Sequence, residues 1–443
     1  MEGLKYLKEY WNKHIETMPR DKLEQLQLER LKFQLKRVYE NVKFYHDLFH
    51  KNGIKPEDIH SLKDLKKLPF TTKDDLRANY PFGLLAVPKE EIVEVHMTSG
   101  TTGIPTPNFL TLKDVDNWGE LIARSLYMGG LRKNDVFQIT PSFSLFTGGF
   151  SFFYGARKIG SFIVPIGPGN SKRQIELMKE LGTTAISGIV SYIVRLSEVA
   201  KEMGVDPAKD LKVRKIYMGS EISTPELKRR LSEFWDADVY DAYGQTETYG
   251  GPSVGEDCPL HDGIHVWEDH FLIEIVDPKT GEVIEDPEEE GELVITTLTK
   301  DAMPLIRYRT RDITFIYEGY HDCERTHRRI SWIKGRVDDM IKFRGVMFWP
   351  SYIEQLILKY PDLSENYQIE LYTEGGLDHM VIKIEPKRQL SEIEKVKLER
   401  IIEEDIHTKF MFTCKVQLVD IGSLPRFETG KAKRIIDKRE RVI

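Results

Sequence analysis

Hydrophobic and polar residues follow two different spacings along the chain, and together these spacings predict an α/β fold. From residue 21 to residue 42 the apolar positions recur every three or four residues among charged ones, which is typical of an amphipathic surface helix. From residue 136 to residue 218, short runs rich in β-branched residues alternate with helical patterns. We therefore expect a domain of largely parallel strands covered by helices, with ligands collecting at the carboxyl ends of the strands.

The pattern changes to hairpins in the next part of the chain. Two strand-like runs at 271–276 and 291–297 flank a turn rich in Pro, Gly and Glu. Further on, short strands and a helix over 391–409 suit a small α+β domain. We place the boundary at a charged stretch that begins at Gly335. The expected organisation is a large N-terminal domain of mixed sheets and helices, 1–335, and a small C-terminal domain, 336–443.

Composition narrows the classes of function. The chain has 443 residues, which exceeds what one hydrophobic core usually supports, and 40% of them are hydrophobic. A net charge of −7 leaves no electrostatic footprint for nucleic acid. Three cysteines are too few for a disulfide framework, and no apolar run suits a membrane span or a signal peptide at the start. We expect a cytoplasmic protein whose partners are small molecules, with neither nucleic acid nor membrane among them.

One loop rich in glycine and hydroxyl residues, 96–106, lies between strand-like runs at 92–95 and 108–111. Gly100 and Gly103 allow the backbone to approach a ligand closely, and the hydroxyl and N–H groups form a nest suited to phosphate oxygens. The loop lacks the G-x-x-x-x-G-K-[ST] pattern of a Walker loop. Taken alone, it is more typical of an ordinary polar turn than of a binding site.

Four further motifs accompany the loop: YGQTE at 243–247, RYRTRD at 307–312, GRVDDMIKFRG at 335–345 and GKAK at 430–433. Separately they are typical of a turn, a basic strand, a charged linker and a basic tail. In this order and at these separations, they resemble the adenylate-forming (acyl-CoA synthetase) superfamily. Three segments are similar to phenylacetate–CoA ligases in particular, namely LFTGG at 145–149, HVWEDH at 265–270 and AMPLIRYRTRD at 302–312.

The resemblance implies an ATP-dependent ligase that joins a carboxylic acid to coenzyme A through an acyl-adenylate. Its acid is then phenylacetate or a related aryl acid, its products include AMP and pyrophosphate, and it uses Mg²⁺. Because a carboxylate is a poor acyl donor, catalysis in this superfamily is mostly positioning and charge neutralisation. By resemblance Glu247 binds the magnesium ion, and Lys431 reaches the attacking carboxylate and the α-phosphate. These two residues are the expected catalytic pair.

The resemblance also assigns the nucleotide-binding residues. Asp312 accepts hydrogen bonds from the ribose hydroxyls, a role that suits a short carboxylate, and Arg336 supports the nucleotide from the domain junction. Tyr243 and the turn at 219–221 border the adenine. The β- and γ-phosphates are held by Ser99, Gly100, Thr101, Thr102 and Gly103. The full expected set adds Gly219, Ser220, Glu221, Asp241, Gly244, Gln245 and Thr246.

The resemblance extends to the acyl group and to the domain junction. Phe143, Phe146 and Gly149 are the expected substrate-contacting residues, although the phenylalanines suit an ordinary core equally well. Phe143 and Pro141 stand where phenylacetate ligases commonly have tyrosines, which leaves the identity of the acid open. Asp338 matches the hinge about which a small, mobile C-terminal domain rotates between two half-reactions. An ordinary charged linker is the alternative interpretation of this residue.

One departure weakens the phosphate loop, and two other functions stay open. Ile104 stands where relatives usually carry lysine, so part of the positive charge of the loop is missing. One alternative is an adenylating enzyme that transfers its group to a carrier protein or a deazaflavin cofactor. Another is a nucleotide-binding protein without turnover, against which the joint presence of Glu247, Asp312 and Lys431 argues. A homodimer is left open as a form of the protein.

Cysteines and histidines suggest a structural metal site. Cys258 with His261, and His321 with Cys323, form two short pairs that together make the Cys₂His₂ set of a tetrahedral zinc ion. His265 is the expected substitute if His261 points away, and chance clustering of histidines is the alternative interpretation. Four protein ligands leave no open position for a substrate. We therefore expect such a site to join distant loops and stabilise the fold rather than perform chemistry.

Overall fold

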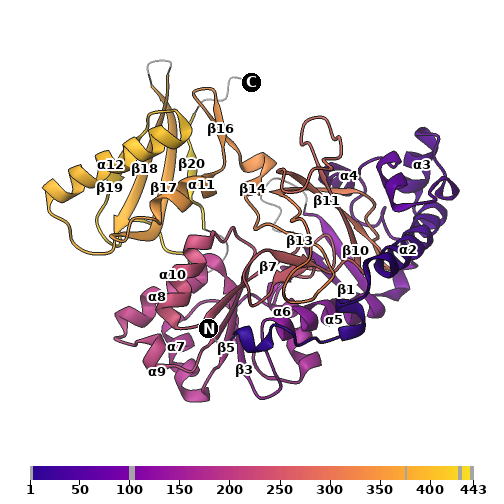
Figure 1. Cartoon of the computed structure of the whole chain (residues 1–443), viewed down its shortest axis with the longest axis horizontal. Helices are drawn as coiled ribbons and strands as arrows, with labels where there is room; N and C mark the ends of the chain where they lie inside the picture. Colours follow the sequence, from indigo (N-terminus) through magenta and orange to yellow (C-terminus); the bar gives the residue numbers. More distant parts are fainter. Residues whose placement is uncertain (1–2, 99–104, 375–376, 428–431, 440–443) are drawn as a thin grey trace.

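The structure is a computed structural model that describes residues 3–98, 105–374, 377–427 and 432–439. Figure 1 shows a large part, coloured indigo to orange, and a smaller yellow part that lies beside helices α8 (Val190–Glu202) and α10 (Pro225–Trp235). This architecture confirms the predicted fold class, a large α/β N-terminal part followed by a small α+β part. Among the helices of the described residues, none is long and apolar enough to cross a bilayer.

An eight-stranded mixed sheet forms the centre of the large part. Its spatial order is β13 (Arg329–Ile330), β9 (Ile264–Val266), β8 (Gly255–Asp257), β7 (Asp238–Tyr243), β6 (Lys215–Gly219), β5 (Ala185–Ile189), β3 (Val136–Ile139) and β4 (Phe162–Val164). Strands β3 to β7 pair in parallel, as predicted, whereas β7, β8, β9 and β13 pair antiparallel. The middle strands are almost continuously apolar because both faces of the sheet are covered.

Helices cover the two faces of this sheet, and successive side chains of a strand point to opposite faces. Tyr217 and Tyr240 belong to the core shared with α5 (Leu112–Met128) and α6 (Gly148–Ile159). Their neighbours Ile216 and Val239 belong to the core shared with α8 and α10. The sheet is therefore held rigidly between two layers, and its carboxyl edge is a fixed platform for a site.

A second sheet of the large part is antiparallel, in the order β10 (Phe271–Val276), β11 (Gly291–Thr297), β12 (Tyr308–Thr314) and β14 (Gly335–Arg336). β10 and β11 form the predicted hairpin at the expected residues. β1 (Ile92–Met97) and β2 (Pro107–Thr111) pair antiparallel and flank the hydroxyl-rich loop. The predicted surface helix is α2 (Arg20–Asn41), which packs against a separate apolar cluster.

The remaining segments of the large part are mostly short helices. Residues 55–77 contain η2 (Pro56–Asp58), η3 (Leu62–Lys67) and the start of α4 (Lys73–Ala78). Elsewhere the described residues form η1 (Gly3–Tyr6), α1 (Lys13–Glu16), α3 (Lys43–Lys51), η4 (Lys89–Glu91), α7 (Ser171–Leu181) and α9 (Pro207–Asp210).

The C-terminal part has its own apolar core. It contains η5 (Val337–Asp339), the hairpin β15 (Ile341–Phe343) and β16 (Val346–Phe348), and the helices α11 (Pro350–Ile357) and α12 (Glu392–Phe410). Its sheet has the order β19 (Lys415–Leu418), β18 (Leu377–Pro386), β17 (Leu363–Glu374) and β20 (Ile435–Asp437). Because β14 still pairs with β12 of the large part, the chain crosses between the parts directly after it. The limits 1–335 and 336–443 stay a prediction.

Candidate functional site

The candidate site lies at the carboxyl ends of β6 and β7. These strands are parallel neighbours, and Gly219 lies opposite Ala242. A Cβ at Gly219 would lie 2.5 Å from the Ala242 carbonyl oxygen, so the close approach of the strands requires glycine here. The chain then turns through Ser220, whose φ is 70°, to Glu221. The turn and the segment that follows Tyr243 therefore share one edge of the sheet, as expected for a ligand site in an α/β fold.

Asp312 joins three of the sequence motifs through its carboxylate. Tyr243 Oη and Gln245 Nε2 donate to Asp312 Oδ2 at 2.6 and 2.7 Å, and Arg336 Nη1 donates to Oδ1 at 3.1 Å. Asp312 and Arg336 are opposite each other in the β12 and β14 pair. The structure thus brings these four predicted residues into direct contact around one buried carboxylate.

Glu247 has two polar neighbours that the sequence analysis missed. Tyr308 Oη donates to Glu247 Oε1 at 3.3 Å, and Lys73 Nζ lies 3.3 Å from the same oxygen. Lys73 is the first residue of α4, directly after the capping residue Thr72. The local sequence signal at Lys73 indicates a helix start rather than a binding residue. A lysine and a tyrosine hydroxyl therefore face the expected magnesium ligand.

Two groups of expected residues lie outside the described part of the chain. They are the catalytic candidate Lys431 and the phosphate-binding candidates Ser99, Gly100, Thr101, Thr102 and Gly103. The residues that flank the loop are described: Thr98 N donates to Thr106 O at 3.1 Å, and Thr106 N donates to Thr98 Oγ1 at 3.0 Å. Beyond Lys431, Ala432 N donates to Glu221 Oε1 at 2.7 Å. The residue after Lys431 thus contacts the turn that follows β6, at the carboxyl edge of the sheet.

Asp241 and Thr246 occupy buried positions on the same edge, and Gly244 between them is partly buried. Asp241 N donates to Asp257 Oδ1 at 2.8 Å. Burial raises the pKa of the Asp241 carboxyl to about 7, against the opposing effect of Lys228 and with a contribution from Asp257. A Cβ at Gly244 would lie 2.5 Å from a backbone nitrogen of the loop before β8. The charge of this edge therefore changes near neutral pH, and its backbone packing requires glycine.

The expected acyl-contacting residues lie on the loop and helix that follow β3. Phe143 packs edge-on against Phe150 and Phe153, with ring centroids 5.4 and 6.2 Å apart. Gly149 N donates to Ser142 O at 3.0 Å, and a Cβ on Gly149 would lie 2.7 Å from that oxygen. The same loop contacts β1, because Met97 N donates to Leu145 O at 2.9 Å. Phe143 and Gly149 therefore stand beside the strand that leads into the hydroxyl-rich loop, as does the neighbouring Phe146.

Asp338 lies in η5, at the crossing between the two parts. Its Oδ1 accepts from Arg336 Nε at 3.1 Å, and Arg311 Nη1 lies 3.5 Å from Oδ2. Trp349 Nε1 donates to Arg336 O at 2.8 Å, which attaches the C-terminal part to the residue before the crossing. The side chain of Asp338 is half-exposed. The hinge assignment is consistent with this position and stays a prediction.

A cluster of cysteines and histidines lies apart from these residues, next to β8 and β9. One ligating atom from each of Cys258, His265, His321 and Cys323 lies within 4.8 Å of the others. Cys323 Sγ is 3.3 Å from His265 Nε2 and 3.1 Å from His321 Nδ1, and Cys258 Sγ is 3.7 Å from His321 Nδ1. Ligands around a tetrahedral zinc ion lie about 3.3–3.8 Å apart, so the donor set and spacing fit zinc.

His261 does not belong to this cluster, which corrects its expected place. It lies in a turn with φ of 52°, and its Nδ1 is 3.1 Å from Asp257 Oδ2. His265 takes the position instead, because its place in β9 directs its Nε2 toward Cys323. Its other ring nitrogen, Nδ1, lies 3.3 Å from the His327 carbonyl oxygen. Such a contact leaves Nε2 available as a metal ligand.

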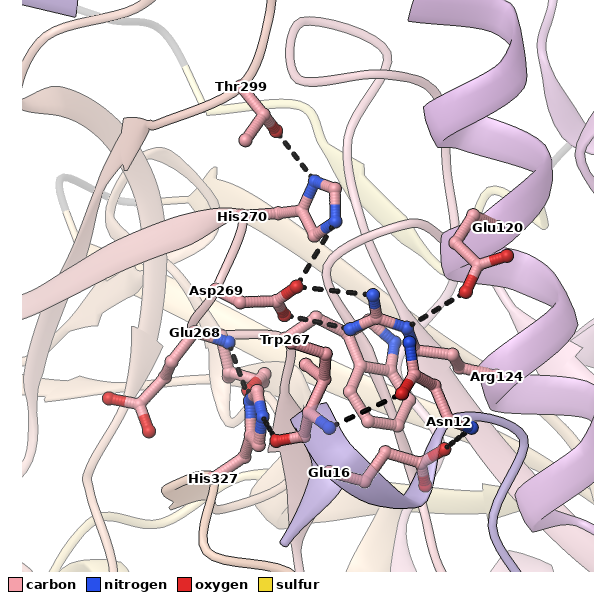
Figure 2. Close-up of polar contacts among 12 residues, drawn as sticks. Asn12, Glu16, Glu120, Arg124, Trp267, Glu268, Asp269, His270, Thr299 and His327 are labelled. Atoms are coloured by element: carbon pink, nitrogen blue, oxygen red, sulfur yellow. Dashed lines mark hydrogen bonds and ion pairs between the residues drawn. The ribbon is translucent and has the colours of Figure 1, made fainter. Parts of the chain in front are cut away.

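A second polar centre surrounds the segment 267–270, shown in Figure 2. Arg124 Nη1 and Nη2 donate to the two oxygens of Asp269 at 2.8 and 3.1 Å, and His270 Nε2 lies 3.3 Å from Asp269 Oδ2. His270 Nδ1 lies 2.6 Å from Thr299 Oγ1, and Glu268 N donates to His327 Nδ1 at 2.9 Å. These side chains come from α5, the loop before β10, the segment after β11 and the segment before β13. The contacts of this centre connect elements of the fold. Its segment, 265–270, is one of the three that resemble phenylacetate–CoA ligases.

Comparison with known proteins identifies the family. Residues 25–299 match the family model "AMP-binding enzyme", and residues 345–439 match "AMP-binding enzyme C-terminal domain". The chain belongs to the AMP-binding enzyme family. It is 42% identical to the phenylacetate-coenzyme A ligase of Aromatoleum evansii, with 96% of each chain covered. It is 40% identical to the enzyme of that name from Escherichia coli strain K12, with 96% of this chain and 97% of the relative covered.

Solved structures of one CoA ligase represent two states of that ligase. The chain is 28% identical to 2-hydroxyisobutyryl-CoA ligase, with 97% of this chain and 93% of the other covered. The TM-score is 0.90 to that ligase in its postadenylation state in complex with an acyl-AMP. It is 0.71 to the same ligase with acyl-AMP and CoA in the thioesterification state. The difference in TM-score at the same identity and coverage reflects a difference in arrangement within the ligase.

Proposed function

We propose that this protein is an ATP-dependent carboxylic acid–CoA ligase that forms an acyl-adenylate from phenylacetate or a related aryl acid and releases AMP and pyrophosphate. The observation that carries the proposal is the identity of 40 to 42% to phenylacetate-coenzyme A ligases along nearly the whole of both chains. The contacts among Tyr243, Gln245, Asp312 and Arg336 support it, because they assemble four expected nucleotide-binding residues from three separate motifs.

The contacts of the site suggest a role for each charged group. Asp312 would accept from the ribose hydroxyls. Both oxygens of its carboxylate act as acceptors in the structure, and a carboxylate has about four acceptor positions in all. Glu247 would hold Mg²⁺, which when bound neutralises phosphate charge. Lys73 provides a cation next to Glu247. Its positive charge would compensate for the one that the phosphate loop lacks because Ile104 stands in place of a lysine.

The arrangement of the two parts supports a ligase with two working states. The chain is more similar to the postadenylation state of 2-hydroxyisobutyryl-CoA ligase than to its thioesterification state. We assign the present arrangement to adenylation, and rotation about Asp338 to thioester formation. In Asp338→Pro, the fixed φ of proline should suppress acyl-CoA formation while the fold stays intact. Unchanged acyl-CoA formation in a folded variant would show that the hinge lies elsewhere.

The activity is tested by incubating the protein with ATP, Mg²⁺ and CoA and a panel of aromatic and short aliphatic acids. Pyrophosphate and AMP are measured separately, and acyl-CoA is identified by mass spectrometry. We expect phenylacetate or a close aryl acid to give all three products in equal amounts. Pyrophosphate without acyl-CoA would indicate a different acceptor, and no pyrophosphate with any acid would contradict the proposal.

Lys431→Ala tests the expected catalytic lysine. Loss of a positioned charge at the transition state should reduce acid-dependent pyrophosphate release by about two orders of magnitude or more. Conversion of supplied acyl-adenylate and CoA to acyl-CoA should be retained. The neighbouring Lys433→Ala is the matched control, and equal losses in both half-reactions of Lys431→Ala would contradict the assignment.

We further propose that Cys258, His265, His321 and Cys323 bind a structural zinc ion. Their donor set, their mutual distances and the contact of His265 with the His327 carbonyl support this site. The cluster lies beside β8 and β9, away from Asp312 and Glu247, so the ion would stabilise loops rather than take part in the reaction.

Metal analysis tests the zinc site on protein purified without a histidine tag. We expect about one zinc per chain, lost in Cys323→Ser together with several degrees of melting temperature. Cys414→Ser is the control, because Cys414 lies in the C-terminal part and outside the cluster. Metal-free protein with the same melting temperature as the bulk preparation would contradict the proposed zinc site.

A further inference from the structure

Two acidic side chains of the large part contact residues of the C-terminal part on either side of Lys431 in the sequence. Glu198 Oε2 accepts from Arg426 Nε at 3.0 Å. Glu221 Oε1 accepts from Ala432 N at 2.7 Å. Glu198 lies on α8, and Glu221 lies in the turn after β6 that borders the start of this helix. Arg426 and Ala432 thus contact the same region of the large part.

Glu221 is firmly placed by the large part itself. Its Oε2 accepts from Ser191 N at 2.6 Å, in the first turn of α8. Backbone N–H groups in a first helical turn lack intrahelical partners, and the helix dipole favours a carboxylate there. One oxygen of Glu221 therefore stays on α8 while the other reaches the C-terminal part.

Glu198 makes a similar double contact. Its Oε1 accepts from Asn366 Nδ2 at 2.6 Å, so it holds β17 as well as Arg426. Arg426 is also paired with Glu385 of the C-terminal sheet, at 2.6 and 3.0 Å. A charge on α8 is thereby connected through Arg426 to the core of the small part.

The residues after Ala432 are fastened to the C-terminal sheet. Ile369 N donates to Arg434 O at 2.8 Å, and Arg434 Nη1 donates to Glu365 O at 2.8 Å. β20 then continues parallel to β17. Ala432 is therefore at the end of a rigid element. A hydrogen bond to its N–H fixes the position of that element relative to Glu221.

We infer that Glu221, assisted by Glu198, is a positioning residue that holds Ala432, the residue after Lys431, and with it the C-terminal part against the large part for adenylation, and releases them for thioester formation. The inference rests on the proposed function. It gives Glu221 a role different from the expected one, in which the 219–221 turn borders the adenine. Because the contacts join the two parts, they can exist in only one of the two working arrangements.

The test measures the two half-reactions separately in Glu221→Ala. Loss of hydrogen bonds to a charged acceptor should reduce acid-dependent pyrophosphate release about 10- to 100-fold. Conversion of supplied acyl-adenylate and CoA should stay within about twofold of the unchanged protein, since that arrangement does not use the contact. Glu198→Ala should show the same split, about two- to fivefold. Glu221→Gln, which keeps one acceptor oxygen and the size of the side chain, should be intermediate.

Glu202→Ala is the matched control. Glu202 lies on α8 one turn beyond Glu198 and pairs with Arg195 of the same helix at 2.8 Å. Its loss should affect neither half-reaction by more than about twofold. Equal losses in both half-reactions of Glu221→Ala would overturn the inference.

The double variant Glu221→Ala/Lys431→Ala separates positioning from direct contact with ATP. If Glu221 acts through the lysine, the double variant should be no worse than Lys431→Ala alone. Multiplied losses would show that Glu221 contacts the nucleotide and would overturn the inference.

Limited trypsin digestion gives a readout that does not depend on ligase activity. Glu221→Ala should be cut several-fold faster after Lys433 and Arg434 than the unchanged protein and Glu202→Ala, with equal melting temperatures confirming the fold. Equal cleavage rates would overturn the positioning role. Faster cleavage in a protein that makes no adenylate from any acid would support the contact and reject the ligase function.

Discussion

The centre around Asp269 and the site around Glu247 are both buried and charged, but they differ in how their charges are matched. Asp269 is held by both nitrogens of the Arg124 fork at 2.8 and 3.1 Å, and the two side chains are only 2% and 3% exposed. Glu247 has two longer contacts, 3.3 Å to Tyr308 Oη and 3.3 Å to Lys73 Nζ. Lys73 is about one quarter exposed, so its ammonium group can turn to another anion.

The difference teaches how to separate structural from functional charge in this chain. A bidentate arginine pair without solvent costs several kcal/mol to break, so it fixes the elements that it joins. A carboxylate with long contacts to a flexible lysine and a hydroxyl can exchange them for a ligand at small cost. Both segments contributed to the resemblance, yet by this criterion we assign only the second to the proposed reaction.

The largest expected effect is on stability, in Asp269→Asn. Removing the charge opposite a buried arginine leaves Arg124 with only its 3.5 Å contact to Glu120 and should lower the free energy of unfolding by about 3–5 kcal/mol. Activity per folded molecule should stay within about twofold, and urea denaturation measures the loss. Glu24→Gln is the control, because Glu24 pairs with Arg20 on the exposed side of α2. A loss below about 1 kcal/mol would contradict the structural role of the centre.

The reverse pattern is expected for Glu247→Gln. Loss of the proposed magnesium ligand should reduce pyrophosphate release about 100-fold, equivalent to about 2.7 kcal/mol at the transition state. The melting temperature should be nearly unchanged, because no tight pair is broken. Glu289→Gln, in the exposed turn before β11, serves as the control. Equal damage to stability and activity would remove the distinction between the two regions.

The third prediction concerns pH and the structural centre. Burial lowers the pKa of the His270 imidazole to about 3, with Asp269 opposing and Arg124 reinforcing the shift. Between pH 6.5 and about 3 the unfolded chain takes up a proton that the folded chain does not, so stability falls as the pH falls. The contribution from pH 7 to pH 5 is about 2 kcal/mol. His270→Gln should show a shallower loss by this amount in unfolding curves, and parallel pH profiles would contradict the shift.

The smallest effect is expected for Tyr308→Phe. Removing one neutral hydroxyl donor from Glu247 should reduce adenylation about three- to fivefold, or about 1 kcal/mol. The phenyl ring keeps the packing of Tyr308 in its apolar cluster, so stability should hold. Steady-state measurement at limiting Mg²⁺ is the most sensitive assay. A loss as large as that of Glu247→Gln would mean that the hydroxyl itself contacts the substrate.

Local sequence patterns determined the elements of this protein. The hairpin 271–276 and 291–297 and the helix from about residue 21 appear where periodicity predicted them. Motif order indicated the family, because several separate motifs occur in one order along the chain. These signals are local or linear, and a single sequence displays them directly.

Tertiary structure alone decided which side chains meet. The sequence favoured His261 beside Cys258 and kept His265 as the substitute, but strand β9 directs His265 toward Cys323 while the turn directs His261 toward Asp257. Lys73 reaches Glu247, and Glu221 reaches Ala432, across long sequence separations. Periodicity specifies which face of an element is buried, whereas such contacts depend on how whole elements pack, and no local pattern encodes that.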